Sequence, residues 1–141
     1  MKLDFFLLAD QIERGEDEKL SVVGGLVTHV RVDSVPTQIR LASAARLLIE
    51  DEDSAAEQPF ELFIRLVPPE GVELRSNPVV IPPEALSGEV LHPGEERSVL
   101  VIGDLNGLPI AVSGLHRLQL VLNDEVIGER SLVVIVGEAS S

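Results

Sequence analysis

Three histidines, His29, His92 and His116, are the side chains of this 141-residue chain best suited to bind a metal or transfer a proton. None has a second histidine or a cysteine at the spacing of a zinc site, which needs three or four such ligands. A serine hydrolase of the G-x-S-x-G type is not indicated either, because Val112 to Gly114 lacks the leading glycine. We therefore expect no catalytic residue and no metal ligand, and interpret the histidines as surface or hydrogen-bonded side chains.

Acidic residues form two short clusters whose oxygen atoms could bind calcium. Residues 16–18 are Glu-Asp-Glu, and Glu50 to Asp53 are all acidic. Neither cluster alternates acidic residues with a glycine, as a D-x-D-x-D-G loop does, and Asp104 to Gly107 is typical of a turn. We interpret both clusters as solvated loops without a cofactor. A calcium- or small-ligand-binding domain that uses these loops is the alternative.

Gly24 and Gly25 interrupt the apolar segment Leu20 to Val30, where a glycine-rich loop could hold a phosphate. A dinucleotide-binding fingerprint needs G-x-G-x-x-G between a strand and a helix. Here the two glycines are adjacent, no third follows at that spacing, and the next residues continue as a strand. We therefore predict a structural role for both, at a bend where one long strand leaves one sheet and joins another.

The composition argues against nucleic acid, membrane surfaces and carbohydrate as partners. The formal net charge is −13, which repels phosphate groups. Tryptophan and tyrosine are absent and only four phenylalanines are present, so few aromatic rings could stack on bases or sugars. No apolar run approaches the roughly 20 residues of a membrane span. The absence of cysteine fits a cytoplasmic protein.

The elements that would position any site are predicted by a hydrophobic period of two. Phe60 to Val67 and Arg117 to Leu122 alternate apolar and polar residues, which is typical of half-buried antiparallel strands. The segment 39–50 is rich in alanine and could be a helix, but its alternation favours a strand. Proline and Asn-Gly turns separate the predicted strands, which cover residues 3–12, 20–31, 38–50, 60–67, 72–81, 97–103, 115–122 and 126–136.

These strands predict an all-β fold, an antiparallel sandwich of seven or eight strands. One domain would cover residues 1–137, and residues 138–141 would form a short flexible tail. The segment 72–81 is the weakest of the predicted strands, because prolines interrupt it.

Three groups of segments, in this order, resemble a bacterial family of small proteins of unknown function. They are FFLLAD with KLSVVGG, IRLASAARLLIE with FELFIRLVPPEG, and GLHRLQLVLNDEVIGERSLVV. The resemblance implies an immunoglobulin-like β-sandwich and brings no activity, cofactor or catalytic residue. Many immunoglobulin-like domains tie a corner with a tyrosine, where this chain has Leu115-His116-Arg117, so that tie is not expected.

The first predicted strand is apolar on both faces. Its odd-numbered residues from Leu3 to Ala9 would face the core, which leaves Phe6 and Leu8 on the other face. These two must be covered by a loop of the same chain or form an exposed apolar patch, and such patches tend to mark interfaces. We take Phe6 and Leu8 as a candidate interface. The sequence thus favours a non-catalytic interaction or structural domain with an unidentified protein partner or a homo-oligomeric state.

Overall fold

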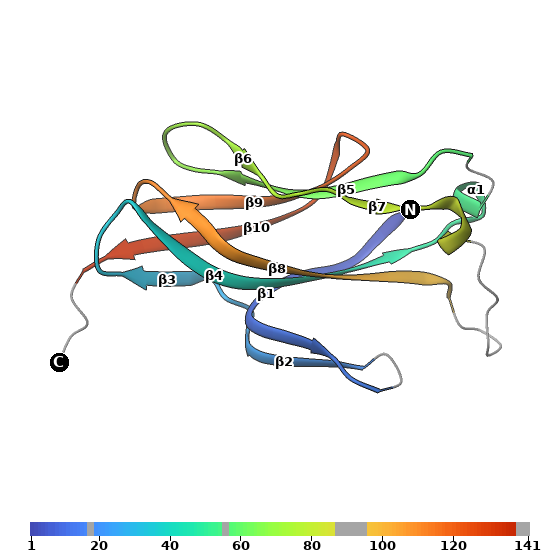
Figure 1. The fold of residues 1–141 in the computed structure, drawn as a ribbon, viewed down its shortest axis with the longest axis horizontal. Coiled ribbons are helices and arrows are strands. Elements are labelled where there is room, and N and C mark those ends of the chain that lie inside the picture. Colours follow the sequence, from blue (N-terminus) through green and yellow to red (C-terminus); the bar gives the residue numbers. More distant parts are fainter. Residues whose placement is uncertain (17–18, 55–56, 87–95, 138–141) are drawn as a thin grey trace.

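The computed structural model describes residues 1–16, 19–54, 57–86 and 96–137. In these residues the chain is all-β, and its strands form two sheets that pack face to face (Figure 1). The strands are β1 (Lys2–Arg14), β2 (Leu20–Gly25), β3 (His29–Val32), β4 (Thr37–Leu48), β5 (Phe60–Val67), β6 (Leu74–Arg75), β7 (Val79–Ile81), β8 (Ser98–Ile110), β9 (Gly114–Leu122) and β10 (Glu125–Val136). Two helical turns, α1 (Asp51–Ser54) and η2 (Pro83–Leu86), lie in the connections.

The first sheet has the order β2-β1-β4-β8, with every pair antiparallel. The second has the order β3-β10-β9-β5-β6, and β7 also pairs with β5. In this sheet β3 runs parallel to β10, whereas the other pairs are antiparallel. Strand structure is found in each predicted segment, including the alanine-rich one, which forms β4, but the segments 20–31 and 72–81 are each divided into two strands and the segment 97–103 extends to Ile110. The tail 138–141 lies outside the described residues.

The chain passes from the first sheet to the second directly after the glycine pair. β2 pairs with β1, whereas β3, which starts four residues after Gly25, pairs with β10 of the other sheet. Gly24 has φ +60° and Leu26 has φ 59°, so the backbone turns through the left-handed region on both sides of Gly25. The predicted strand 20–31 is therefore two strands, divided at the bend that the glycines indicated.

Residues 104–107 do not form the predicted turn but lie inside β8. Ile39 pairs with Leu108 and Leu41 with Leu105, so Asn106 and Gly107 together oppose one residue of β4. This is a β-bulge, and Gly107 has φ +68°. An Asn-Gly pair suits a tight turn and a bulge for the same reason, its tolerance of positive φ, so the sequence alone does not separate the two.

The core lies between the sheets and contains Phe6 and Leu8, which are 3% and 1% exposed. The predicted interface at these two residues is therefore wrong. The cause is a register shift between Leu3 and Phe5 in the pairing of β1 with β4. An extra residue in a strand moves the following side chains to the opposite face, so the core face changes from Leu3 to Phe6 and Leu8.

Beyond Ala9, β1 pairs only with β2, and the two form a hairpin that we call the arm (residues 10–16 and 19–25), which projects from the two sheets (Figure 1). The arm packs on the outer face of the first sheet, where Ile12 and Leu20 contact a small apolar cluster with Ala42, Ala44 and Ile102. Because alanine is small, the arm can approach β4 closely. Arg14 Nη2 also donates a 2.9 Å hydrogen bond to the carbonyl oxygen of Leu100 in β8.

The acidic segment 50–53 is not a free solvated loop, because Asp53 is buried. Asp53 Oδ1 lies 2.8 Å from the ammonium group of Met1, and Oδ2 accepts a 2.7 Å hydrogen bond from the backbone N–H of Glu50. The first interaction joins the start of β1 to the turn α1, and the second resembles a capping box. Sequence reasoning missed this role because it depends on a partner 52 residues away.

We predict that Gly24→Val lowers the free energy of unfolding by about 1–2 kcal/mol or more, because a side chain in the left-handed region is strained. Gly25→Val, at a position without positive φ, should cost less, although its Cβ would lie 2.8 Å from Val22 Cγ1. Urea denaturation of both variants measures the difference. Equal stability of Gly24→Val and the wild type would contradict a structural role.

We also predict that Asp53→Asn lowers the free energy of unfolding by about 1–3 kcal/mol, because it removes a charged acceptor from a buried ammonium group. Glu52→Gln is the matched control, since Glu52 is exposed and should tolerate the same change with no loss. Thermal denaturation of the two variants beside the wild type tests this. Unchanged melting of Asp53→Asn would show that the segment is dispensable.

Candidate functional site

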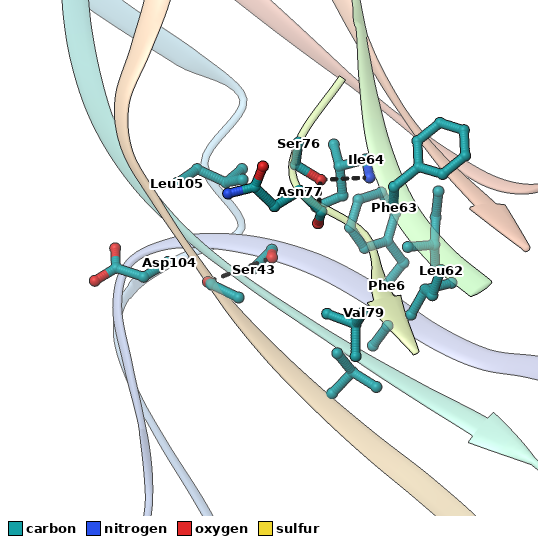
Figure 2. A pocket seen from close by; sticks show the side chains of 14 residues that line it. Phe6, Ser43, Leu62, Phe63, Ile64, Ser76, Asn77, Val79, Asp104 and Leu105 are labelled. Carbon is teal, nitrogen blue, oxygen red and sulfur yellow. Dashed lines mark hydrogen bonds between the residues drawn. The ribbon is translucent and has the colours of Figure 1, made fainter. Parts of the chain in front are cut away.

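The two sheets are joined along one side of the core and open along the other. On the joined side, β1 lies beside β10, and Arg130 Nε of β10 donates a 2.8 Å hydrogen bond to the carbonyl oxygen of Phe6. On the other side a groove opens between β8 and the edge of the second sheet formed by β5, β6 and β7 (Figure 2). We call this the side groove.

The side groove consists of a cavity of about 250 Å³ that continues into one of about 330 Å³. The two cavities share a wall, formed by Ile64, Ser76 and Asn77 on one sheet and Asp104 and Leu105 on the other. Cavities that bind small organic molecules in proteins are usually about 300–1,000 Å³. The side groove is therefore large enough to take several apolar groups, such as side chains of an extended peptide.

The floor of the side groove is apolar because it is the inner face of the sandwich itself. Phe6, Leu62 and Leu120 reach it from β1, β5 and β9, and Val101 and Leu105 reach it from β8. The residues that face them across the cavity include the small side chains of Ser43, Ala45 and Gly103. Because these do not fill the space between the sheets, a cavity remains, with the nearly buried Phe6, Leu62 and Leu120 at its floor and the half-buried Val101 and Leu105 at its side.

The opening also depends on how the edge of the second sheet is interrupted. Ser76 lies between β6 and β7 and forms with Ile64 the hydrogen bonds that a residue of a neighbouring strand would form. Its Oγ accepts a 2.9 Å hydrogen bond from the Ile64 N–H, and its own N–H donates a 2.8 Å bond to the Ile64 oxygen. Pro78, which has no N–H to donate, interrupts the pairing with β5, which resumes at Val79. The segment is thereby held flat against β5 and does not extend across the groove.

The polar groups of the side groove are mostly neutral. Ser43 is 4% exposed, and its hydroxyl contacts only the Gly103 oxygen at 3.4 Å, which is a long distance for an O–H···O bond. Asn77 lies at the opening, and the carboxylate of Asp104 points away from the floor toward Asn106, whose Nδ2 donates to it at 2.9 Å (Figure 2). This arrangement suits binding through apolar contact and hydrogen bonds.

The histidines and acidic clusters singled out in the sequence do not meet at this groove. His29 is exposed on β3 beside Thr28, and His92 lies outside the described residues, as do Asp17 and Glu18. Within the described ranges, no group of three His, Cys, Asp or Glu residues could hold a metal ion. Sequence reasoning missed the groove, although the weak, proline-interrupted segment 72–81 was a signal of an incomplete sheet edge.

His116 is fully buried in β9, where its Nδ1 lies 3.0 Å from the carbonyl oxygen of Gly114. A carbonyl only accepts, so Nδ1 carries the proton, and the other ring nitrogen, Nε2, has no hydrogen-bond partner in the structure. The hydrogen bond ties the backbone at Gly114, which has φ +113°. A histidine therefore fixes the start of β9, where a corner tyrosine is absent.

Two comparisons with known proteins bear on the chain. The model of a family described as "Family of unknown function (DUF6941)" matches residues 4–135. No curated protein matches the chain. Among the residues that the structure describes, no helix is long and apolar enough to cross a membrane.

Proposed function

We propose that this chain, which belongs to the family of unknown function whose model it matches, is a non-catalytic domain that binds a protein partner through the side groove. The observation that carries the proposal is the apolar lining of the groove, in which the exposed Val79 and the half-buried Val101 and Leu105 lie above a nearly buried apolar floor. An apolar side chain of a partner that enters the groove removes this surface from water, which is favourable.

The partner segment is best described as extended and apolar. The side groove runs along β8 from Val101 to Pro109, so a linear peptide can lie beside it with side chains directed inward. The charged residues that line the groove are Asp104 and Arg75, whose guanidinium lies 4.5 Å from the centroid of the Phe63 ring, and the neutral polar atoms of Ser43 and Asn77 suit the backbone of a peptide. The absence of cysteine in the sequence supports placing this interaction in the cytoplasm.

The proposal includes an immunoglobulin-like arrangement of the sandwich. Its support is the strand order, in which an early strand changes sheet and then pairs in parallel with the last strand, β10. The remaining strands of the second sheet are antiparallel neighbours of β10 and β9. Domains with this arrangement commonly carry binding surfaces on a stable sandwich rather than a catalytic centre.

A small apolar ligand is the second candidate occupant, because the cavity volumes are close to the lower limit for such sites. It would place its apolar body on the same floor and direct one polar group toward the Ser43 hydroxyl. Calcium binding by the acidic loops has no comparable support, since the carboxylates of the described residues do not gather.

We predict that Val79→Asp abolishes partner binding without unfolding the domain. Val79 lines the side groove and is exposed, so a carboxylate there must be desolvated when a peptide covers it. Val72→Asp is the matched control, because Val72 is also exposed but lines neither cavity. Random peptides displayed on phage are selected on the wild type, and their affinities are then measured by fluorescence polarisation on all three proteins.

The selected peptides should be rich in apolar residues and bind Val79→Asp at least about tenfold more weakly, a difference of about 1.4 kcal/mol. Val72→Asp should bind them as the wild type does. A failure to select any peptide, or equal binding to Val79→Asp, would overturn the protein-binding function. Saturable binding of hexanol in place of peptides would then favour the small-ligand candidate.

A further inference from the structure

A second surface, independent of the side groove, is the free edge of the arm. In the described strands, the sheets end at β2 and β8 on one layer and at β3 and the β6–β7 segment on the other. Such edges expose backbone N–H and C=O groups and are usually protected against pairing with another chain. The four edges of this sandwich differ in how far they are protected.

Three of the edges carry features that hinder pairing. On β8, the Leu100 carbonyl is already occupied by Arg14, a bulge interrupts the strand at Asn106 and Gly107, and Pro109 has no N–H to donate. β6 and β7 have two and three residues, and Pro78 separates them. β3 has four residues, one of which is charged.

β2 has fewer of these protective features, since no proline or bulge interrupts it and Lys19 lies outside the strand itself. It has six residues, LSVVGG, without proline or charge, and Val22 and Val23 are 40% and 58% exposed. Lys19 is the only charged residue from position 19 to position 26, although the whole chain has a net charge of −13. An uncharged, valine-containing edge strand is a favourable template for another strand.

The backbone orientation of β2 follows from its hairpin. Gly15 N–H donates a 2.7 Å hydrogen bond to the Lys19 oxygen, so these two residues face each other. Hydrogen-bonded positions alternate along an antiparallel pair, which turns the N–H and C=O groups of Ser21 and Val23 toward β1. The same groups of Leu20 and Val22 therefore point away from β1, toward the open edge.

We propose that β2 pairs with β2 of a second copy of this chain, antiparallel, about a twofold axis at Ser21. In this register Leu20 of each copy faces Val22 of the other, and four backbone hydrogen bonds form between groups that are otherwise unpaired. The first sheets of the two copies then become one continuous sheet. Ser21 faces Ser21 of the second copy at the axis, where no charge opposes another.

The length of the contact is limited by the bend in each chain. Gly24 has φ +60°, so the strand departs from the extended conformation after Val23, and the paired segment runs from Lys19 to Val23. A pair this short buries less than a standard interface, which gives a weak, reversible dimer. The shortness also favours the register at Ser21, because a shift toward Gly24 would lose pairing.

Charge favours a second copy at this edge more than elsewhere on the acidic surface. Of the acidic residues that the structure describes in the arm, Asp10 and Glu13 lie on β1, so two strand spacings of about 4.8 Å separate them from the strand of the second copy, and Glu16 lies at the tip, outside the paired strands. That distance is comparable with the Debye length of about 8 Å in physiological salt, which screens the remaining repulsion. Added salt should therefore strengthen the dimer.

The test uses Ser21→Lys on the full chain, with Gln11→Lys as the matched control. Both residues are exposed on the same face of the arm, but only Ser21 meets its own copy at the axis. Sedimentation equilibrium of the wild type should give a dimer with a Kd below about 1 mM, tighter in high salt. Ser21→Lys should weaken it about threefold or more, because like charges then face each other, while Gln11→Lys should not.

A mixture of Ser21→Lys and Ser21→Glu should restore association, because opposite charges then meet at the axis. In NMR spectra of the wild type, the amides of Leu20 and Val22 should become protected from hydrogen exchange as the protein concentration rises, whereas those of Ser21 and Val23 should not change. A wild type that stays monomeric up to about 1 mM overturns the proposal. A dimer that Ser21→Lys and Gln11→Lys affect equally overturns it too.

Discussion

The packing of two sheets on one core requires that each strand keep its apolar side chains on the inner face, and a shift of one residue reverses that face. In this chain β-bulges shift the register within single strands and so keep the apolar side chains on the inner face. A bulge after Leu3 brings Phe6 and Leu8 inward, and another at Asn106 and Gly107 keeps Leu105 and Leu108 both against the core. The left-handed residues around Gly25 let a single segment contribute to both sheets.

The core that results is built from aliphatic side chains, because the chain has only four phenylalanines and no tyrosine or tryptophan. Aliphatic side chains fill the space beside β1 and β10, where Arg130 also bonds across to the first sheet. On the opposite side, Ser43, Ala45 and Gly103 leave the side groove. The candidate site is thus a consequence of incomplete filling between two sheets rather than of a cluster of reactive residues.

One side of the arm packs on the first sheet, while its edge strand stays exposed. Its inner side rests on Ala42 and Ala44, and Arg14 shields part of the β8 edge. Its own outer strand, β2, receives no such protection. The alanine-rich composition of β4 is explained by its two faces. Leu41 and Leu47 point inward and fill the core, whereas the outward residues must be small because the arm packs on them.

The amino-acid sequence by itself determined the fold class and the positions of the strands, because alternation and turn residues act over a few neighbouring positions. It also indicated the bend at Gly24 and Gly25, since glycine inside an apolar strand is typical of a bulge or a sharp bend. Only the tertiary structure decided that Phe6 is buried, that Asp53 binds the Met1 ammonium group and that the side groove is open. Each of these depends on register or contact between segments far apart in the chain, which local patterns do not encode. An Asn-Gly pair tolerates positive φ in a turn and in a bulge alike, and the pairing with β4 determined which of the two formed.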